Sequence, residues 1–292
     1  MAAGSLIGEM TAAGPVLTDG AWGTEMQSRG LAAGETPDFW NLSHPDRVEE
    51  VARAYVTAGS QVVLTNTFRA NRIALAKHPD VERVAEVNRA GVEISRRAAG
   101  DRARVFASIG PCGKLLMTGE VDEAALRAAF DEQAQALAAG GADAIVVETM
   151  SDLAEAGIAV EAAKATGLPV VACMVSDSGK NRDRTMMGVT PTQAAEELTR
   201  LGADAIGANC GTGVEDYIPI CASLAAATPL PVWIKPNAGL PELENGEVVY
   251  RTTPSEFAAK VPKLREAGAR FVGGCCGTSP EFIQAMRREL DA

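Results

Sequence analysis

The chain has few aromatic residues, only two histidines and no excess of positive charge. Aromatic residues make up 4% of its 292 residues, and 27 Lys plus Arg stand against 38 Asp plus Glu, a formal net charge of −11. Surfaces that bind nucleic acids or anionic membranes are usually basic, so the charge argues against both kinds of partner. A Ser-His-Asp mechanism also has little support, because His44 and His78 each stand directly before a proline, where a turn or a helix begins.

Long apolar runs, an export signal and dense cysteine spacing are absent as well. No stretch is long enough for a transmembrane helix, so we expect no membrane span. Residues 1–13 lack the basic and apolar regions of a secretory signal, and we expect them to form a flexible N-terminal tail. The six cysteines are not spaced as a disulfide framework, which favours reduced thiols and a cytoplasmic protein.

Eight short apolar runs alternate with longer stretches that have helical periodicity. Runs that are apolar on both faces are typical of parallel strands covered by helices. Eight such units most simply close into a (β/α)8 TIM barrel, so we predict a single α/β domain over residues 14–292. An open doubly wound sheet is the alternative, but residues 19–24 do not match the glycine-rich phosphate loop that usually follows its first strand. The runs are 16–18, 62–65, 105–109, 144–147, 170–174, 205–208, 232–235 and 271–274.

Polar residues recur where these strands are expected to end. Catalytic residues of a TIM barrel lie at the C-terminal ends of its strands, so side chains from several runs should meet at one mouth. The predicted strand ends place carboxylates, amides and thiols there: Asp19, Asn66, Glu148, Asn209, Cys210, Asn237, Cys275 and Cys276.

Three of these residues, Cys210, Cys275 and Cys276, predict a metal site. Three thiolates select zinc most readily, and a site with three protein ligands keeps a fourth position open for catalysis. The glycines on both sides of Cys275 and Cys276 would let neighbouring side chains face one ion. The other cysteines, Cys112, Cys173 and Cys221, are better explained as small buried hydrophobic residues.

The two carboxylates can be interpreted in two ways. Asp19 and Glu148 could cap the helices that follow them. Beside a metal they could instead attract a substrate ammonium group, while the backbone amides of residues 20–24 hold the matching carboxylate of an amino acid. Composition alone leaves both interpretations open.

The motifs at the strand ends resemble the homocysteine S-methyltransferase family. The resemblance runs from Asp19 to Thr278, and its most specific part is Gly-Ala-Asn-Cys followed later by Gly-Gly-Cys-Cys-Gly-Thr. It implies a zinc-dependent TIM barrel enzyme that methylates the thiol of L-homocysteine to give methionine. The matching segments are 19–24, 65–68, 148–149, 207–210, 236–239 and 273–278.

The resemblance also implies roles for individual residues. Cys210, Cys275 and Cys276 would hold Zn²⁺, and the sulfur of homocysteine would take the open position. Asp19 and Glu148 would bind its ammonium group, and Asn237 would be a weak oxygen ligand in the absence of substrate. The whole substrate site would comprise Asp19, Gly20, Ala21, Thr24, Asn66, Glu148, Asn209 and Asn237.

The methyl donor is predicted to be a methylated corrinoid. Betaine-using members carry tyrosines where this chain has Arg69 and Thr149, and a quaternary ammonium donor needs an aromatic cage. The segments 19–24 and 65–68 are spelled as in the methionine-synthase branch, yet no cobalamin motif is present. The corrinoid would therefore be free or carried by a separate partner protein. S-methylmethionine and S-adenosylmethionine are the alternative donors.

Two other functions remain open from the sequence. One is a zinc lyase or hydrolase that uses metal-bound water, although no histidine stands at a strand end to act as its base. The other is a zinc-stabilised barrel that binds amino acids or a corrinoid protein without catalysis. A methyl-transfer assay separates these functions from the predicted one.

Overall fold

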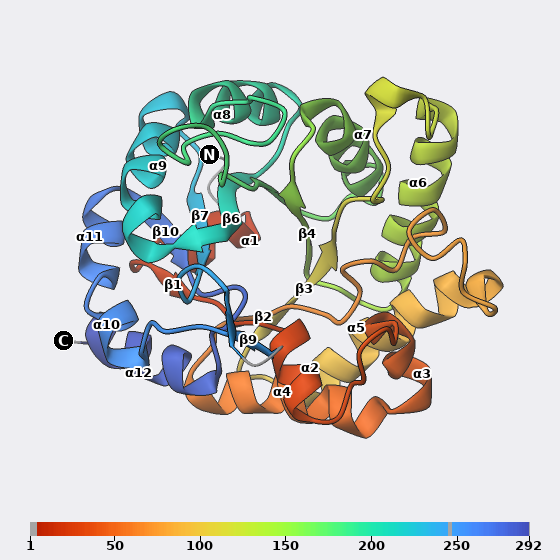
Figure 1. Ribbon diagram of the computed structural model, residues 1–292, viewed down its shortest axis with the longest axis horizontal. Coiled ribbons are helices and arrows are strands. Elements are labelled where there is room, and N and C mark those ends of the chain that lie inside the picture. The colour runs from red at the N-terminus through yellow and green to blue at the C-terminus, as the bar shows by residue number, and fades with distance from the viewer. Residues whose placement is uncertain (1–4, 245–246, 292) are drawn as a thin grey trace.

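The barrel strands form one ring in the computed structural model, which describes residues 5–244 and 247–291 (Figure 1). Every pair of neighbouring strands in this sheet is parallel, and their order is β1-β10-β7-β6-β5-β4-β3-β2. This confirms the predicted TIM barrel, and each of the eight apolar runs overlaps one barrel strand. The barrel strands are β1 Val16–Leu17, β2 Val62–Val63, β3 Arg104–Ile109, β4 Ala144–Met150, β5 Val170–Met174, β6 Ala205–Gly213, β7 Val232–Asn237 and β10 Ala269–Val272.

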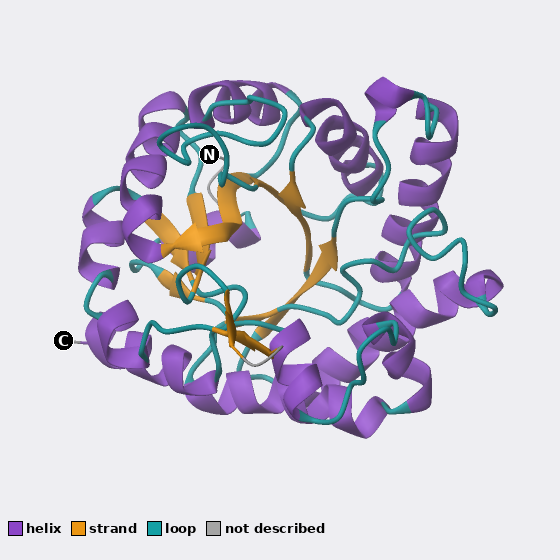
Figure 2. Cartoon of the chain, in the orientation of Figure 1, coloured by secondary structure: helices purple, strands orange, loops and turns teal. Residues whose placement is uncertain are grey.

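Helices surround the ring of strands (Figure 2). A short antiparallel hairpin, β8 Glu242–Glu244 and β9 Glu247–Val249, extends from the loop after β7. The α-helices are α1 Leu6–Thr11, α2 Gly23–Ser28, α3 Trp40–Ser43, α4 Pro45–Ala58, α5 Val84–Ala99, α6 Glu123–Ala139, α7 Leu153–Lys164, α8 Pro191–Arg200, α9 Val214–Ala227, α10 Pro254–Ala258, α11 Val261–Glu266 and α12 Pro280–Asp291. Single 3₁₀ turns are η1 Pro37–Phe39, η2 Val81–Arg83 and η3 Leu116–Thr118.

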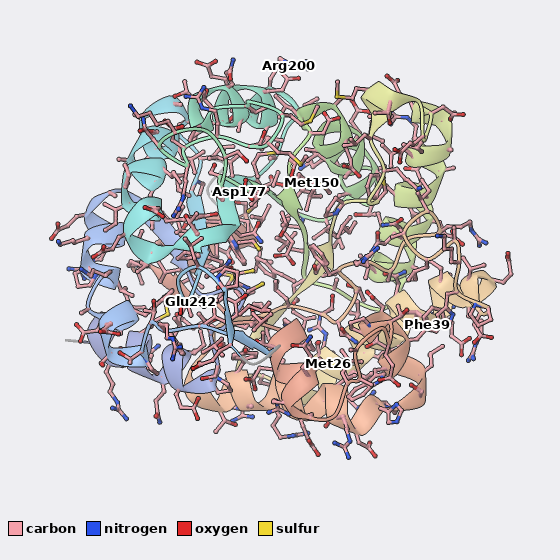
Figure 3. All side chains as sticks on the ribbon, in the orientation of Figure 1. Met26, Phe39, Met150, Asp177, Arg200 and Glu242 are labelled. Carbon is pink, nitrogen blue, oxygen red and sulfur yellow. The ribbon has the colours of Figure 1, made fainter. Side chains whose placement is uncertain are left out.

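Each barrel strand buries both of its faces, which explains its unbroken apolar run. Side chains on one face pack against the helices, and alternate side chains belong to a second cluster inside the ring. Phe106, Trp233 and Phe271 fill much of that interior, with ring centroids of Trp233 and Phe271 5.0 Å apart. Figure 3 shows side chains filling the space enclosed by the strands, so the barrel is a packed core and not a pore.

The ring closes differently between β1 and β2 than elsewhere. These two short strands form no ladder with each other. The backbone N–H of Gln61 donates to the Leu17 carbonyl at 2.7 Å, and the Gln61 side-chain oxygen accepts from the Leu17 N–H at 3.0 Å. At the mouth end of this seam, the Leu64 N–H donates to a carboxylate oxygen of Asp19 at 2.7 Å. Side chains therefore supply two of the bonds that close the barrel here.

The N-terminal segment differs from its prediction. Residues 6–11 form helix α1 instead of a flexible tail, and the Ser5 side chain caps it by accepting from the Gly8 N–H. Ile7 is buried in the cluster inside the ring, so α1 gains apolar burial that its short length could not provide alone. Residues 1–4 of the predicted tail lie outside the described part of the chain. Within residues 5–244 and 247–291, no helix combines the length and apolar character needed to cross a bilayer.

Candidate functional site

A pocket of about 330 Å³ opens at the C-terminal ends of the barrel strands. Most of the residues predicted for the site lie along its wall: Gly20, Ala21, Thr24, Asn66, Glu148, Cys210, Cys275 and Cys276. The remaining three, Asp19, Asn209 and Asn237, are buried outside that wall. Asp19 bonds to Trp22 and Asn209 bonds to Glu148, both of them wall residues, whereas Asn237 bonds to the carbonyl next to Cys210, that of Gly211. Pockets of this size accommodate small-molecule ligands.

The three predicted metal ligands form one cluster. The Sγ atoms of Cys210, Cys275 and Cys276 all lie within 4.8 Å of one another, and those of Cys210 and Cys276 are 3.9 Å apart. With zinc–sulfur bonds of about 2.3 Å, two thiolates of a tetrahedral zinc site lie roughly 3.8 Å apart, so the cluster suits this metal. All three thiols are free, and the other cysteines are buried elsewhere in the core.

The backbone is shaped to aim these thiols at one point. Cys210 has φ of +66°, an uncommon value for a residue with a Cβ, and Gly211 follows with φ of +69°. Strand β6 shifts its register against β7 just after Cys210. On the other side, Gly277 has φ of +80° and packs against Tyr250 so closely that an added Cβ would lie 2.3 Å from the ring. Local irregularities in two segments thus produce the cluster.

Two polar side chains, Asn237 and Tyr250, lie beside the cysteine cluster. Asn237 donates from Nδ2 to the Gly211 carbonyl at 3.0 Å, while its buried Oδ1 has no hydrogen-bond partner among the described residues. A buried acceptor without a donor is costly, so this oxygen is available to a ligand or metal ion. Tyr250 lies beside Cys276, and burial together with the charge of that thiol raises the pKa of the phenol.

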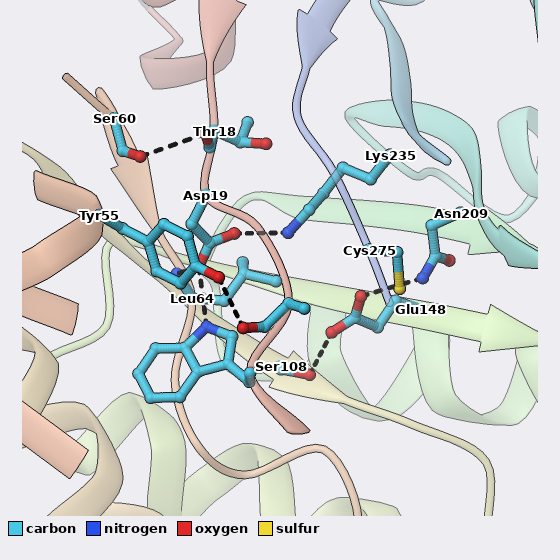
Figure 4. A network of polar contacts seen from close by, with 12 residues as sticks. Thr18, Asp19, Tyr55, Ser60, Leu64, Ser108, Glu148, Asn209, Lys235 and Cys275 are labelled. Atoms are coloured by element: carbon cyan, nitrogen blue, oxygen red, sulfur yellow. Dashed lines mark hydrogen bonds and ion pairs between the residues drawn. The ribbon is translucent and has the colours of Figure 1, made fainter. Parts of the chain in front are cut away.

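The Asp19 carboxylate is surrounded by donors (Figure 4). Its Oδ2 accepts from the Leu64 N–H at 2.7 Å and from the indole Nε1 of Trp22 at 2.8 Å. Its Oδ1 forms an ion pair with Nζ of Lys235, and both of these side chains are buried. Burial lowers the pKa of Lys235, but the nearby charges of Asp19 and Glu148 outweigh it and leave that pKa raised.

Glu148 is held differently from Asp19. Its Oε1 accepts from the Ser108 hydroxyl, and its Oε2 accepts from Asn209 Nδ2 at 3.1 Å (Figure 4). Asn209 also bonds to Thr149, accepting from its N–H and donating to its hydroxyl, each at 2.7 Å. Burial raises the pKa of Glu148, and the charge of Lys235 opposes this shift. Glu148 is thus a buried carboxylate whose hydrogen-bond partners are neutral.

Some polar groups of the loop after β1 and of the Asn66 side chain already have hydrogen-bond partners within the chain. The Ala21 N–H donates to the Thr278 carbonyl at 3.0 Å, so this amide is not available to a ligand. Gly23 and Thr24 open α2, and amides at a helix start have no intrahelical partner. Asn66 donates from Nδ2 to the Pro37 carbonyl at 2.7 Å and to the side chain of a neighbouring asparagine, which fixes the loop containing η1.

Lys235 is the site residue that the sequence prediction missed. It stands inside the apolar run that forms β7 and was counted as part of that strand. A charged residue within a doubly buried strand must find a partner, and this was the signal that could have identified it. Ser108 also lines the pocket, and it lies in no motif that marks it as a site residue.

Comparisons with known proteins agree on one family. The model of the homocysteine S-methyltransferase family matches residues 16–290. Methionine synthase of Mycobacterium tuberculosis is 34% identical over 287 residues, and that of Mycobacterium leprae is 31% identical over 284 residues. Each match covers 92% of this chain and 24% of the relative, so the chain spans about a quarter of the length of these methionine synthases.

The solved structures include a similar fold. The metallated form of the homocysteine methyltransferase MmuM from Escherichia coli aligns with a TM-score of 0.78 at 24% identity. The alignment covers 94% of this chain and 96% of that one. The two proteins therefore share one barrel architecture over nearly their whole length.

Proposed function

Because the chain belongs to the homocysteine S-methyltransferase family, we propose that it transfers a methyl group to the thiol of L-homocysteine and so produces methionine. The observation that carries this proposal is the cluster of three thiols in a pocket that also contains a buried carboxylate. Thiol ligands suit zinc, and the carboxylate suits the ammonium group of an amino acid. A hydrolase or lyase would need a general base at the metal; the pocket wall contains no histidine for this role, and the proposal assigns its carboxylate Glu148 to the ammonium group.

Cys210, Cys275 and Cys276 would hold the zinc ion, and Asn237 Oδ1 would complete its shell in the absence of substrate. Zinc held there would lower the pKa of a further thiol, so that the substrate sulfur would be a thiolate at neutral pH. The backbone irregularities at Cys210 and Gly277 preorganise the thiols and reduce the rearrangement that binding requires.

The rest of the pocket would orient the substrate. Glu148 would bind the α-ammonium group, and the free amides of Gly23 and Thr24 would bind the α-carboxylate. With both ends of the amino acid held, its sulfur is directed toward the cysteines and toward the mouth, which favours attack in line. The sulfur forms a bond to the methyl carbon, its thiol proton passes to solvent, and the leaving group keeps the electron pair of the broken bond.

A methylated corrinoid is the donor that we favour, carried by a partner protein or free. The spelling of segments 19–24 and 65–68, which resembles the methionine-synthase branch, supports a corrinoid. Arg69 and Thr149 line the pocket at the positions where betaine-using members carry tyrosines. Among the described residues, all of the exposed large hydrophobic side chains lie in the segments that lead from a barrel strand to the next helix, including η3 and the hairpin of β8 and β9. These segments leave the ends of the strands at which the mouth opens. We propose that these side chains contribute to the surface on which a corrinoid protein would dock. They are Met117, Met186, Leu240, Leu243 and Val248.

The identity of the methyl donor is tested by assaying each candidate donor separately. Zinc-loaded protein is incubated with L-homocysteine and one of methylcobalamin, a methylated corrinoid protein, betaine, S-methylmethionine or S-adenosylmethionine, and methionine is measured. We expect turnover with a corrinoid donor. Turnover with only betaine or a sulfonium would overturn the donor and keep the acceptor, whereas no methionine with any donor would favour a barrel that binds without catalysis.

The acceptor is tested independently of the donor by X-ray absorption at the zinc edge. Adding L-homocysteine should replace one nitrogen or oxygen neighbour of the zinc with a fourth sulfur. An unchanged shell of three sulfurs and one lighter atom, at saturating homocysteine, would contradict the proposed binding mode.

A further inference from the structure

The Asp19 carboxylate has little capacity left for a substrate. It accepts from the Leu64 N–H and the Trp22 indole on one oxygen and from Lys235 on the other. Asp19 is fully buried and does not reach the pocket surface. An ammonium group could bind it only by displacing one of these donors.

Two of the three contacts have a structural purpose. The bond from Leu64 spans the seam between β1 and β2, where no ladder joins the strands. A second side chain, Ser60, donates across the same seam to the Thr18 carbonyl at 3.2 Å (Figure 4). The bond from Trp22 fixes the residue that precedes α2. Asp19 thus closes the barrel and positions the loop above it.

The third contact provides a positive charge from within the protein. Lys235 is 2% exposed, and Asp19 is its only ion-pair partner among residues 5–244 and 247–291. Two buried charges of opposite sign compensate each other, whereas either one alone would be strongly unfavourable. Lys235 therefore supplies to Asp19 the ammonium group that a substrate would otherwise have to supply.

Of the two carboxylates predicted to bind the ammonium group, Glu148 is the one without a bonded cation. Its two hydrogen-bond donors, Ser108 and Asn209, are both neutral. A carboxylate accepts about four hydrogen bonds, so capacity remains on the side that faces the pocket. Together, Asp19, Lys235 and Glu148 carry a net charge of −1, which one ammonium group neutralises.

We infer that Lys235 is the internal counter-ion of Asp19 and that Glu148, and not Asp19, binds the α-ammonium group of the thiol substrate. The inference rests on the proposed function and narrows it, because the sequence prediction assigned both carboxylates to the ammonium group. Lys235 is then a positioning residue: it removes Asp19 from substrate recognition and sets the charge of the pocket.

Calorimetric titration of the zinc-loaded protein tests the assignment without a methyl donor. The ligands are L-homocysteine and 4-mercaptobutyrate, which lacks the α-ammonium group. We expect the wild-type protein to prefer homocysteine by about ten- to a hundredfold, the range for hydrogen bonds to charged groups. Asp19→Asn/Lys235→Met, which removes the ion pair and keeps an acceptor for Leu64 and Trp22, should retain that preference within about threefold.

Glu148→Gln is the decisive single variant. It should reduce the ratio of the two affinities to about one. A residual preference of more than about fivefold would show that a second carboxylate, Asp19 or Asp38, shares the ammonium group and would overturn the inference. Loss of the preference in the Asp19/Lys235 double variant would also overturn the inference. If the wild-type protein binds no homocysteine, the proposed function fails together with the inference; if it binds and only the variants disagree, the inference alone fails.

Thermal unfolding tests the counter-ion separately. Asp19→Asn and Lys235→Met each leave one buried charge unpaired, so each single variant should unfold at a lower temperature than the double variant. Additive effects of the two substitutions would contradict the pairing.

Discussion

The two ends of the barrel use carboxylates in opposite ways. At the end where helices lead into strands, Asp143 and Asp204 accept from backbone N–H groups of neighbouring strands, Val105 and Val170, each at 2.8 Å. Both are also paired with basic side chains at the surface. At the mouth, Glu148 is buried without a bonded cation.

This difference separates residues that stabilise the barrel from residues that are prepared for a ligand. Asp143 and Asp204, at the lower end of the barrel opposite the mouth, have both hydrogen-bond donors and basic partners within the chain. Selection for stability alone would favour this arrangement. Glu148 at the mouth keeps a cost of burial that the charge of Lys235 and the bond from Ser108 offset only in part, a pattern typical of functional sites. Asp19 is the exception, since it lies at the mouth and is saturated like the lower carboxylates.

The largest expected effect comes from the cysteine cluster. Cys210→Ala, Cys275→Ala or Cys276→Ala should abolish zinc binding, which we expect at about one ion per chain. Methyl transfer should fall roughly a thousandfold or more, because the metal contributes several kcal/mol to activation of the sulfur. Zinc content is measured by atomic emission, and the fold is followed by circular dichroism. Cys112→Ala, Cys173→Ala and Cys221→Ala are the matched controls; full zinc in a cluster variant would refute the ligand assignment.

The next effect concerns Glu148. Glu148→Gln should raise the KM for L-homocysteine about ten- to a hundredfold, because a hydrogen bond between charged groups contributes roughly 1.5–3 kcal/mol. Steady-state kinetics at saturating donor measures it. Asp143→Asn is the matched carboxylate at the other end and should leave KM unchanged; similar increases in both variants would mean that the two ends do not differ as described.

A smaller effect is the pH dependence of the free energy of unfolding that the buried Asp38 at the mouth should cause. Burial raises the pKa of Asp38, at the pocket wall, from 3.8 to about 6. The folded state then binds its proton more tightly than the unfolded state, so the free energy of unfolding falls as pH rises through about 6. Asp38→Asn keeps an acceptor for the Arg69 N–H and should stabilise the protein at pH 7.5 by roughly 1–3 kcal/mol. Urea unfolding should show a much smaller gain at pH 4.5; an equal gain at both pH values would contradict the assignment.

The smallest effect lies at the lower end. Asp204→Ala removes the acceptor for the Val170 N–H and the partner of Lys164, and should lower the free energy of unfolding by about 1–2 kcal/mol. The KM for homocysteine and the zinc content should not change. A change in either would show that this end contributes to the site.

The sequence predicted the strands well because each is buried on both faces and therefore apolar throughout. It also identified the cysteine cluster, since the glycines around Cys275 and Cys276 mark an unusual backbone. Helix α1 was missed because its stability comes from the burial of Ile7 beneath the ring, a contact that local periodicity does not contain. The hairpin of β8 and β9 was missed because its side chains are mostly exposed and show no buried face.

The pairing of Asp19 with Lys235 was beyond local patterns for a different reason. The two residues are 216 positions apart in the chain and meet only because β1 and β7 are both neighbours of β10. Sequence reasoning placed both carboxylates at one mouth but could not show which of them was already neutralised. That question depends on where one lysine side chain points.

The seam between β1 and β2 has a consequence for the motions of the barrel. Leu17 and Gln61 are joined across it by two hydrogen bonds, one of which depends on a side chain that is free to rotate once released. Local opening needs the fewest bonds to break at such a place. In hydrogen–deuterium exchange, the amides of Leu17, Gln61 and Leu64 should therefore exchange before those in the interior of β4 and β5. Because the Leu64 amide donates to Asp19, its protection factor also measures whether the Asp19 carboxylate beneath the pocket stays in place.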